Sequence, residues 1–197
     1  MKILFALFSY LFGSIPSGYI LFRLSDHKDI RHFGSQTTGA TNILRLKGWK
    51  YGLAVLLIDF AKGFIPVSLA LRLFSDKRIA LISAALVVVG HCFPLYIKFR
   101  GGKGLATTMG TYAALAFKPF LLSFSIFLFA VVITRYVSLG SIAAVFSFPL
   151  LLLLFDREKE VIFLSLVLLG LVLIRHVENI KRLIHGKERR IGEKVRI

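Results

Sequence analysis

The segment that decides the fold runs from Pro119 to Phe155 and reads PFLLSFSIFLFAVVITRYVSLGSIAAVFSFPLLLLLF. It contains one charged side chain, Arg135, near its middle. A helix rises about 1.5 Å per residue, so one helix over this length would far exceed the roughly 30 Å hydrocarbon core of a bilayer. We therefore expect two membrane-spanning helices, 119–134 and 137–155, joined by a turn at Arg135 and Tyr136.

The rest of the chain continues this apolar pattern. Of the 197 residues, 56% are hydrophobic and the mean hydropathy is +0.76, whereas soluble domains are about 45–50% apolar. No repeat, linker or shift in composition divides the chain. The sequence therefore predicts one polytopic all-α membrane domain over residues 1–197, with an interrupted first helix and a short fourth helix. The seven predicted spans are 3–22, 53–73, 79–97, 105–117, 119–134, 137–155 and 160–174.

The charges indicate the orientation. The chain holds 26 Lys and Arg against 10 Asp and Glu, a net charge of +16. With seven spans, 18 of the basic residues fall on one side and 7 on the other. Because excess positive charge stays in the cytoplasm, we expect the N-terminus outside and the C-terminus inside. Apolar runs near bilayer length exclude a soluble nucleic-acid binder, and a single cysteine, Cys92, excludes a disulfide framework or a multi-cysteine metal site.

Polar residues within the spans gather toward the ends predicted to be cytoplasmic. Such residues are tolerated at membrane depth where they line a cavity or pair internally. They predict a pocket open to the cytosol, although Asp59 and Lys62 could simply form a structural ion pair and His91 could be an ordinary buried histidine. The set comprises Ser14, Ser17, Tyr19, Asp59, Lys62, His91, Thr107, Thr108, Arg175, His176 and Asn179.

Two loops on the same predicted side have the chemistry of anion sites. The first, residues 34–42, is rich in Gly, Ser, Thr and Asn and is followed by Arg45, whose planar guanidinium suits phosphate. The second, residues 101–104, reads GGKG and precedes an apolar helix, whose N-terminus attracts anions. Alternatively, the first loop has ordinary turn chemistry and the basic residues around the second are membrane anchors.

Several membrane chemistries lack their residues. Clustered carboxylates for a magnesium-dependent transferase are missing, no histidine has Asp four residues later, and no G-x-S-x-G motif occurs. We therefore expect an enzyme that binds and orients an already activated substrate. The competing interpretation is a transporter or binding protein for a phosphorylated small molecule.

Five motif blocks carry a family resemblance over nearly the whole chain. The blocks are 13–19 (GSIPSGY), 29–45 with Asp29-Ile30-Arg31 and Gly39 to Arg45, 59–63, 90–104 (GHCFPLYIKFRGGKG) and 175–188 with Arg175-His176, Lys181 and Glu188. In their order and spacing the chain resembles the bacterial acyl-phosphate:glycerol-3-phosphate acyltransferases, the PlsY family. It departs from the family at Gln36-Thr37, where Gly-Asn is common.

This resemblance implies a reaction. Acyl phosphate would acylate the sn-1 hydroxyl of glycerol 3-phosphate, giving lysophosphatidate and phosphate at the cytoplasmic face of a bacterial cell (inner) membrane. It implies no cofactor and no metal. The expected partners are the two substrates, membrane lipid and the soluble enzyme that makes acyl phosphate, with no nucleic acid.

The expected site residues fall into two sets and a choice of base. The residues expected to bind substrate phosphate and polar head groups are Ser35, Thr41, Asn42, Arg45, Gly101, Gly102, Lys103, Gly104, Thr107, His176 and Asn179. Those expected to support the pocket are Ser14, Ser17, Tyr19, Asp59, Lys62, Arg175, Lys181 and Glu188. His176 and His91 are candidate general bases, because imidazole titrates near neutral pH. We favour deprotonation by the donor's own phosphate, whose second pKa is also near neutrality.

Overall fold

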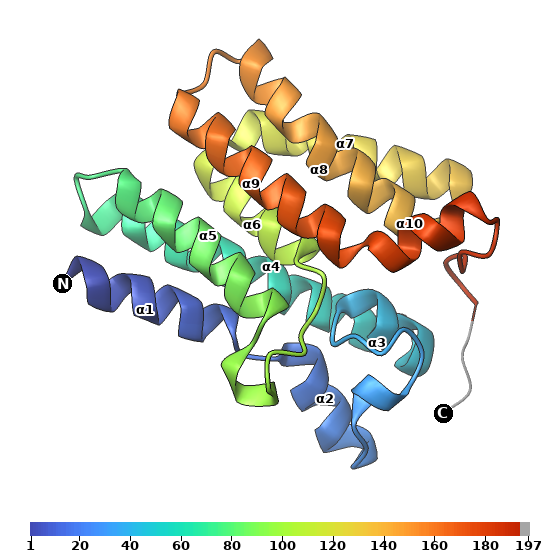
Figure 1. Ribbon diagram of the computed structural model, residues 1–197. Coiled ribbons are helices and arrows are strands. Elements are labelled where there is room, and N and C mark those ends of the chain that lie inside the picture. The colour runs from blue at the N-terminus through green and yellow to red at the C-terminus, as the bar shows by residue number, and fades with distance from the viewer. Residues whose placement is uncertain (194–197) are drawn as a thin grey trace. The chain divides into compact units, whose positions relative to one another are not determined.

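The computed structural model describes residues 1–193, and within them the chain is all helical, with no strand (Figure 1). The predicted all-α fold is confirmed. The α-helices are α1 (Lys2–Gly13), α2 (Ser17–Asp26), α3 (Ala40–Lys47), α4 (Trp49–Leu73), α5 (Arg78–Cys92), α6 (Leu105–Leu115), α7 (Phe117–Thr134), α8 (Val137–Leu154), α9 (Lys159–Arg175) and α10 (Val177–Ile184). Two short 3-10 helices, η1 (Ile30–His32) and η2 (Leu95–Ile97), lie in the loops.

Five stretches among the described residues are long and apolar enough to cross a membrane: Lys2–Asp26, Trp49–Leu73, Arg78–Ile97, Phe117–Thr134 and Val137–Leu154. Helices α9 and α10 meet at a 63° bend and would make a sixth span if they cross together. Helix α6 has 11 residues, about half the length needed at roughly 1.5 Å per residue. The expected short fourth helix is therefore present, but the count of seven spans is not confirmed.

The helix boundaries lie close to the predicted ones, and the breaks have local causes. The first helix is interrupted as expected, because α1 ends at Gly13 and α2 begins at Ser17, after Pro16. The turn between α7 and α8 falls at Arg135, which adopts a left-handed conformation with φ of 61°. Helix α4 begins at Trp49, four residues before the predicted start. Its polar first turn lowered the hydropathy there, although the backbone was already helical.

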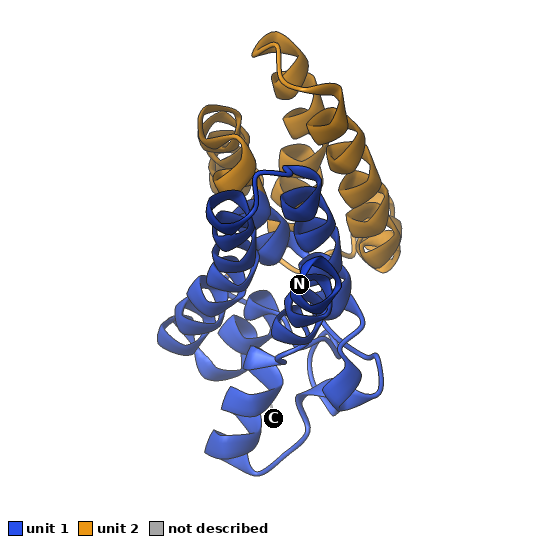
Figure 2. Cartoon of the chain, turned by 90° about the vertical axis from the view of Figure 1, so that its left-hand side faces the viewer, with its two compact units in different colours: residues 1–111, 192–197 blue, residues 112–191 orange. Residues whose placement is uncertain are grey.

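The chain forms two compact units (Figure 2). The first comprises residues 1–111 with residues 192 and 193 of the described chain, and the second comprises residues 112–191. The expectation of a single membrane domain over residues 1–197 stays a prediction.

In the first unit, α1 and α4 both pack against α5, and α3 packs against α4. Ser9 of α1 and Ser83 of α5 are buried, and their hydroxyl oxygens lie 2.5 Å apart. A fully buried apolar cluster of Phe22, Ile30, Ile43 and Val55 lies beneath the polar loop that follows α2. This cluster anchors that loop, since its members come from α2, η1, α3 and α4.

In the second unit, α8 packs against both α7 and α9. The rings of Tyr112 and Phe148 are stacked with centroids 3.5 Å apart. Ser123 donates a hydrogen bond to the carbonyl of Ala144 at 2.7 Å. These contacts join its helices where few side chains are polar.

Candidate functional site

A buried ion pair lies where the first helix is broken. Lys62 Nζ is 2.8 Å from Asp59 Oδ1, and the two side chains are 4% and 1% exposed. The i,i+3 spacing on α4 brings them together, as the sequence suggested. Lys62 also donates to the carbonyl of Ile15 at 2.7 Å, and Ser17 donates to Asp59. The pair therefore satisfies polar groups that the break between α1 and α2 leaves open.

His91 lies next to this pair. Its Nδ1 is 3.5 Å from Lys62 Nζ and 3.7 Å from Asp59 Oδ1. On the other side of the ring, Nε2 faces Gly102, where a Cβ atom would collide with the imidazole. The backbone N–H of Gly102 donates to the carbonyl of His91 at 3.1 Å. The structure thus brings four of the expected residues, Asp59, Lys62, His91 and Gly102, into one cluster.

The glycine-rich loop leads directly into α6. Lys98 and Phe99 have φ of 57° and 61°, so the chain reverses sharply before the glycines. Gly101, Gly102 and Gly104 are buried, while Lys103 is half-buried. At the start of α6 the Thr107 and Thr108 hydroxyls are fully buried and have no hydrogen-bond partner within residues 1–193. Ser14 Oγ, at the break between α1 and α2, is also buried without a hydrogen-bond partner among these residues. Buried hydroxyls are normally paired, so these three groups are notable.

In the loop after α2, the Asn42 side chain shapes the backbone. Its Oδ1 accepts from the N–H of Ser35 at 2.8 Å, and its Nδ2 donates to the carbonyls of Phe33 and Thr37 at 3.1 and 2.9 Å. The Ser35 hydroxyl lies 3.1 Å from that of Thr37. Asn42 therefore acts in this structure by folding the loop that presents Ser35.

Helix α3 follows this loop and carries two further expected ligands. Thr41 is half-buried, and Arg45, one turn later, is 9% exposed. The i,i+4 spacing places both on one face of the helix.

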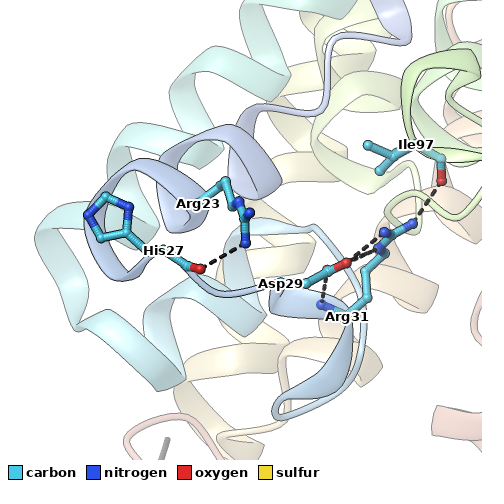
Figure 3. A network of polar contacts seen from close by, with 5 residues as sticks. All are labelled: Arg23, His27, Asp29, Arg31 and Ile97. Atoms are coloured by element: carbon cyan, nitrogen blue, oxygen red, sulfur yellow. Dashed lines mark hydrogen bonds and ion pairs between the residues drawn. The ribbon is translucent and has the colours of Figure 1, made fainter.

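Arg31 is the connection that sequence reasoning missed (Figure 3). Its guanidinium donates hydrogen bonds from two nitrogens to the Asp29 carboxylate, the shorter at 2.6 Å. It also donates to the carbonyl of Ile97 at 2.8 Å. It also lies over the ring of Tyr19, an expected pocket residue, at 5.3 Å from the centroid. The hydrogen bonds from Arg31 hold the pKa of Asp29 below its usual value. The sequence shows that Asp29 and Arg31 are two residues apart, but it does not show that Arg31 also bonds to the carbonyl of Ile97.

Figure 3 also shows how α2 ends. Arg23 donates to the carbonyl of His27 at 2.8 Å, and His27 has a φ of 56°. This C-terminal cap starts the turn that leads to Asp29.

In the second unit, Glu188 is the centre of a hydrogen-bonded network. It accepts from Asn179 at 2.8 Å, from Arg182 at 2.7 Å and from Ser138 at 3.1 Å, and its side chain is 2% exposed. Burial opposes ionisation of this carboxyl group, but the hydrogen bonds from Arg182 and Asn179 outweigh it and lower its pKa below the ordinary value. Glu188 therefore remains ionised and orients Asn179.

The remaining expected residues of this unit differ in exposure. His176 is buried, and its Nδ1 donates to the carbonyl of Val172 at 2.8 Å, because a carbonyl oxygen can only accept. Arg175 is half-buried. Lys181 is exposed and pairs with Glu178 at 2.9 Å. The expected residues thus fall in both units, and His176, Asn179 and Glu188 are the buried ones of the second.

Metal-ligating side chains do not cluster in the part of the chain that the structure describes, where no three His, Cys, Asp or Glu residues could jointly hold an ion. The expectation that the protein needs no metal or cofactor stays a prediction.

Comparison with known proteins identifies the family. Residues 3–186 match the family model described as glycerol-3-phosphate acyltransferase. The glycerol-3-phosphate acyltransferase of Endomicrobium trichonymphae is 42% identical over 97% of this chain and 96% of its own length. That of Aquifex aeolicus is 41% identical over 96% of this chain and 100% of its own length.

Two crystal structures of PlsY, an integral membrane glycerol 3-phosphate acyltransferase, have the same fold. The glycerol 3-phosphate form superposes with a TM-score of 0.93 at 39% identity, covering 97% of this chain and 96% of that one. The lysophosphatidic acid form gives 0.90 at 38% identity, covering 98% and 96%. The chain therefore belongs to the glycerol-3-phosphate acyltransferase family and is an integral membrane acyltransferase.

Proposed function

We propose that the protein transfers an acyl group from acyl phosphate to the sn-1 hydroxyl of glycerol 3-phosphate, giving lysophosphatidate and phosphate. The substrate and product are supported by the glycerol 3-phosphate and lysophosphatidic acid forms of PlsY. Family membership favours this enzyme over the competing transporter. The observation that carries the choice of donor is the glycine-rich loop at the start of α6.

That loop has the features of a phosphate site. Glycine backbone and the N-terminus of a helix present N–H groups and a positive dipole to an anion. Helix α6 begins directly after Gly104, and the buried hydroxyls of Thr107 and Thr108 lie in its first turn. A bound phosphoryl group would satisfy donors that are otherwise buried at a cost. Lys103 adds a positive charge, so we assign this loop to the phosphate of the acyl donor.

The loop after α2 is assigned to glycerol 3-phosphate. Ser35 and Thr41 supply hydroxyls, and the buried Arg45 supplies a guanidinium whose fork matches phosphate oxygens. Asn42 contributes indirectly, because its amide holds the Ser35 backbone. His176 and Asn179, which belong to the second unit, stay proposed ligands of substrate polar groups in their own right.

The proposed reaction needs no nucleophile from the protein. The sn-1 oxygen attacks the acyl carbon, the bond from that carbon to the phosphate oxygen breaks, and the electron pair leaves with phosphate. A phosphate oxygen of the donor takes the hydroxyl proton. His176 and His91 are the protein alternatives: His176 Nδ1 faces the carbonyl of Val172, and His91 Nδ1 faces Lys62 and Asp59. The site's role is then to align both phosphates and stabilise the developing oxyanion.

Purified protein in detergent tests this function. Phosphate release from acyl phosphate should require glycerol 3-phosphate and yield lysophosphatidate, whereas a transporter would bind without turnover. Arg45→Ala and Lys103→Ala should each lose about 1.5–3 kcal/mol of charge-assisted binding, roughly 10–100-fold in affinity. Arg100→Ala, an exposed cation in the same loop as Lys103, is the matched control. Near-wild-type kinetics for both test variants would exclude them as the main phosphate ligands.

Histidine variants test the proton transfer. His176→Gln and His91→Gln should keep the neutral limb of the kcat–pH profile if the donor phosphate is the base. Loss of a general base typically costs about 10²–10⁴ in rate. If one variant loses kcat to that extent, still binds glycerol 3-phosphate and lacks the limb, that histidine is the base.

The location of the enzyme is part of the same proposal. We place the enzyme in the bacterial cell (inner) membrane. The distribution of basic residues favours an orientation with the N-terminus outside, the C-terminus inside and the site at the cytoplasmic face. Of the 18 basic residues assigned inside, Lys194 and Arg196 lie outside the described residues. A soluble enzyme that makes acyl phosphate would then deliver it from the cytosol.

A further inference from the structure

We propose that Lys62, held by Asp59, is a positioning residue that fixes the His91 ring and, through it, the backbone of Gly101 and Gly102. The proposal rests on the function assigned above to the glycine-rich loop, because it names the device that holds this loop in shape. None of these side chains needs to touch substrate for the effect.

The first step is the position of the ion pair. Two charges buried within apolar helices are unfavourable unless their hydrogen bonds are satisfied, and the pair often stabilises no more than packed apolar residues would. Here the pair bonds outward in three directions, to Ile15 and Ser17 in the broken helix and to His91 on α5. The pair thus ties three chain segments to one point, which a packed apolar pair could not do.

The second step is the state of the His91 ring. His91 Nδ1 faces Lys62 Nζ at 3.5 Å and Asp59 Oδ1 at 3.7 Å. We infer that Nδ1 accepts from Lys62, which is the nearer group and has donors but no acceptor. In the neutral ring the proton then sits on Nε2, on the side facing Gly102. Lys62 therefore sets both the tautomer and the rotation of the ring.

The third step is the loop. The Gly102 N–H bonds to the His91 carbonyl, and its Cα lies so close to the ring that alanine would collide with Nε2. At Gly101 a Cβ would collide with the same carbonyl. Gly102 therefore packs against the His91 ring and Gly101 against the His91 carbonyl, and a ring free to rotate would remove the surface beside Gly102. Displacing a binding group by about 1 Å can cost up to roughly 10²-fold in rate.

Five variants and one control test the proposal, and the fifth variant is the double substitution Lys62→Met/His91→Asn. Lys62→Met removes the donor, and Asp59→Asn/Lys62→Met removes both charges so that none is left buried alone. In His91→Asn the amide reaches the Nδ1 position but not Gly102, while in His91→Gln it reaches the Nε2 position. Ser83→Ala breaks a buried polar contact of the same unit, between α1 and α5, away from this cluster. Each variant is compared with wild type by melting temperature and by kcat and KM for both substrates.

The expected result is a loss confined to the acyl phosphate side. The charge-free double variant should melt near wild type yet show a KM for acyl phosphate raised roughly 10-fold or more, with KM for glycerol 3-phosphate unchanged. His91→Gln should be milder than His91→Asn. Lys62→Met/His91→Asn should be no worse than the more severe single variant, because both act on one element. Ser83→Ala should shift melting alone.

A spectroscopic measurement checks the ring directly. With ¹⁵N-labelled histidine, the signal that His91→Gln removes should report a neutral ring protonated at Nε2, and Lys62→Met should change that signal. An Nδ1-protonated ring in the wild type would overturn the proposal. So would His91→Asn matching wild type, or KM values for both substrates moving together.

Failure of the assigned function gives a different pattern. If the wild type does not turn over acyl phosphate, the donor assignment is wrong, and hydrogen exchange of residues 98–108 then decides the positioning role. Faster hydrogen exchange in residues 98–108 of Asp59→Asn/Lys62→Met, but not of Ser83→Ala, supports the positioning role of Lys62. Equal exchange in wild type and double variant overturns it.

Discussion

Replacing Glu188 should destabilise the end of the second unit, and the size of the effect follows from its three hydrogen-bond donors. Alanine at this position leaves the Ser138 hydroxyl and the Asn179 amide, both buried, without their carboxylate acceptor. Each buried polar group left unpaired costs about 1–3 kcal/mol. The Arg182 side chain is 38% exposed, so its ion pair adds less than about 1 kcal/mol.

The loss should total about 2–7 kcal/mol, a large share of a typical stability of roughly 5–15 kcal/mol. For a chain of this length about 2–4 °C in Tm accompanies each kcal/mol, so Glu188→Ala should melt at least about 4 °C lower. Glu188→Gln keeps an acceptor but loses the charge, and should fall in between. Glu178→Gln makes the same charge change at an exposed residue and should move Tm by no more than a degree or two.

The pH dependence of Tm distinguishes the charge of the Glu188 carboxylate from the space and hydrogen-bonding positions of its side chain. Because the pKa of Glu188 is lowered by folding, its ionised form contributes stability above its ordinary pKa of 4.5. This contribution is lost as the pH falls through the lowered value. The gap in Tm between wild type and Glu188→Gln should therefore be full at pH 7 and shrink below pH 4.5. A gap of equal size at every pH, or an equal loss in Glu178→Gln, would refute the reasoning.

Three other outcomes are expected. A reporter fused after Ile197, which lies outside the described residues, should be cytoplasmic, and one in the 75–78 turn external; the reverse would reject the proposed orientation. Arg31→Ala should lose the contact to Ile97 and make residues 95–104 more accessible to protease, whereas Arg23→Ala, which caps α2 alone, should not. Gly63→Val should prevent α4 from packing on the backbone of α6 and lower the yield of folded protein, as judged by size-exclusion chromatography in detergent.

The sequence by itself determined the elements. Helix length, the break at Pro16, the turn at Arg135 and the shortness of residues 105–115 all follow from hydropathy, the rise of a helix and proline chemistry, which are local properties. The motif blocks likewise sufficed for the family, since their order along the chain carries the resemblance. The start of α4 was misplaced because a polar first turn is invisible to hydropathy.

The tertiary structure decided which polar groups meet. Nothing in the spacing joined Arg31 to Ile97, or Glu188 to Ser138 fifty residues away. Asn42, expected to bind phosphate, hydrogen-bonds the backbone of the loop before α3, as short polar side chains readily do. Lys62, His91 and Gly102 come from three separate segments and meet because α4 and α5 pack together. A local pattern can place such residues at one end of a bundle, but their partners are fixed by how the helices pack, and in a medium without water each buried polar group must find one.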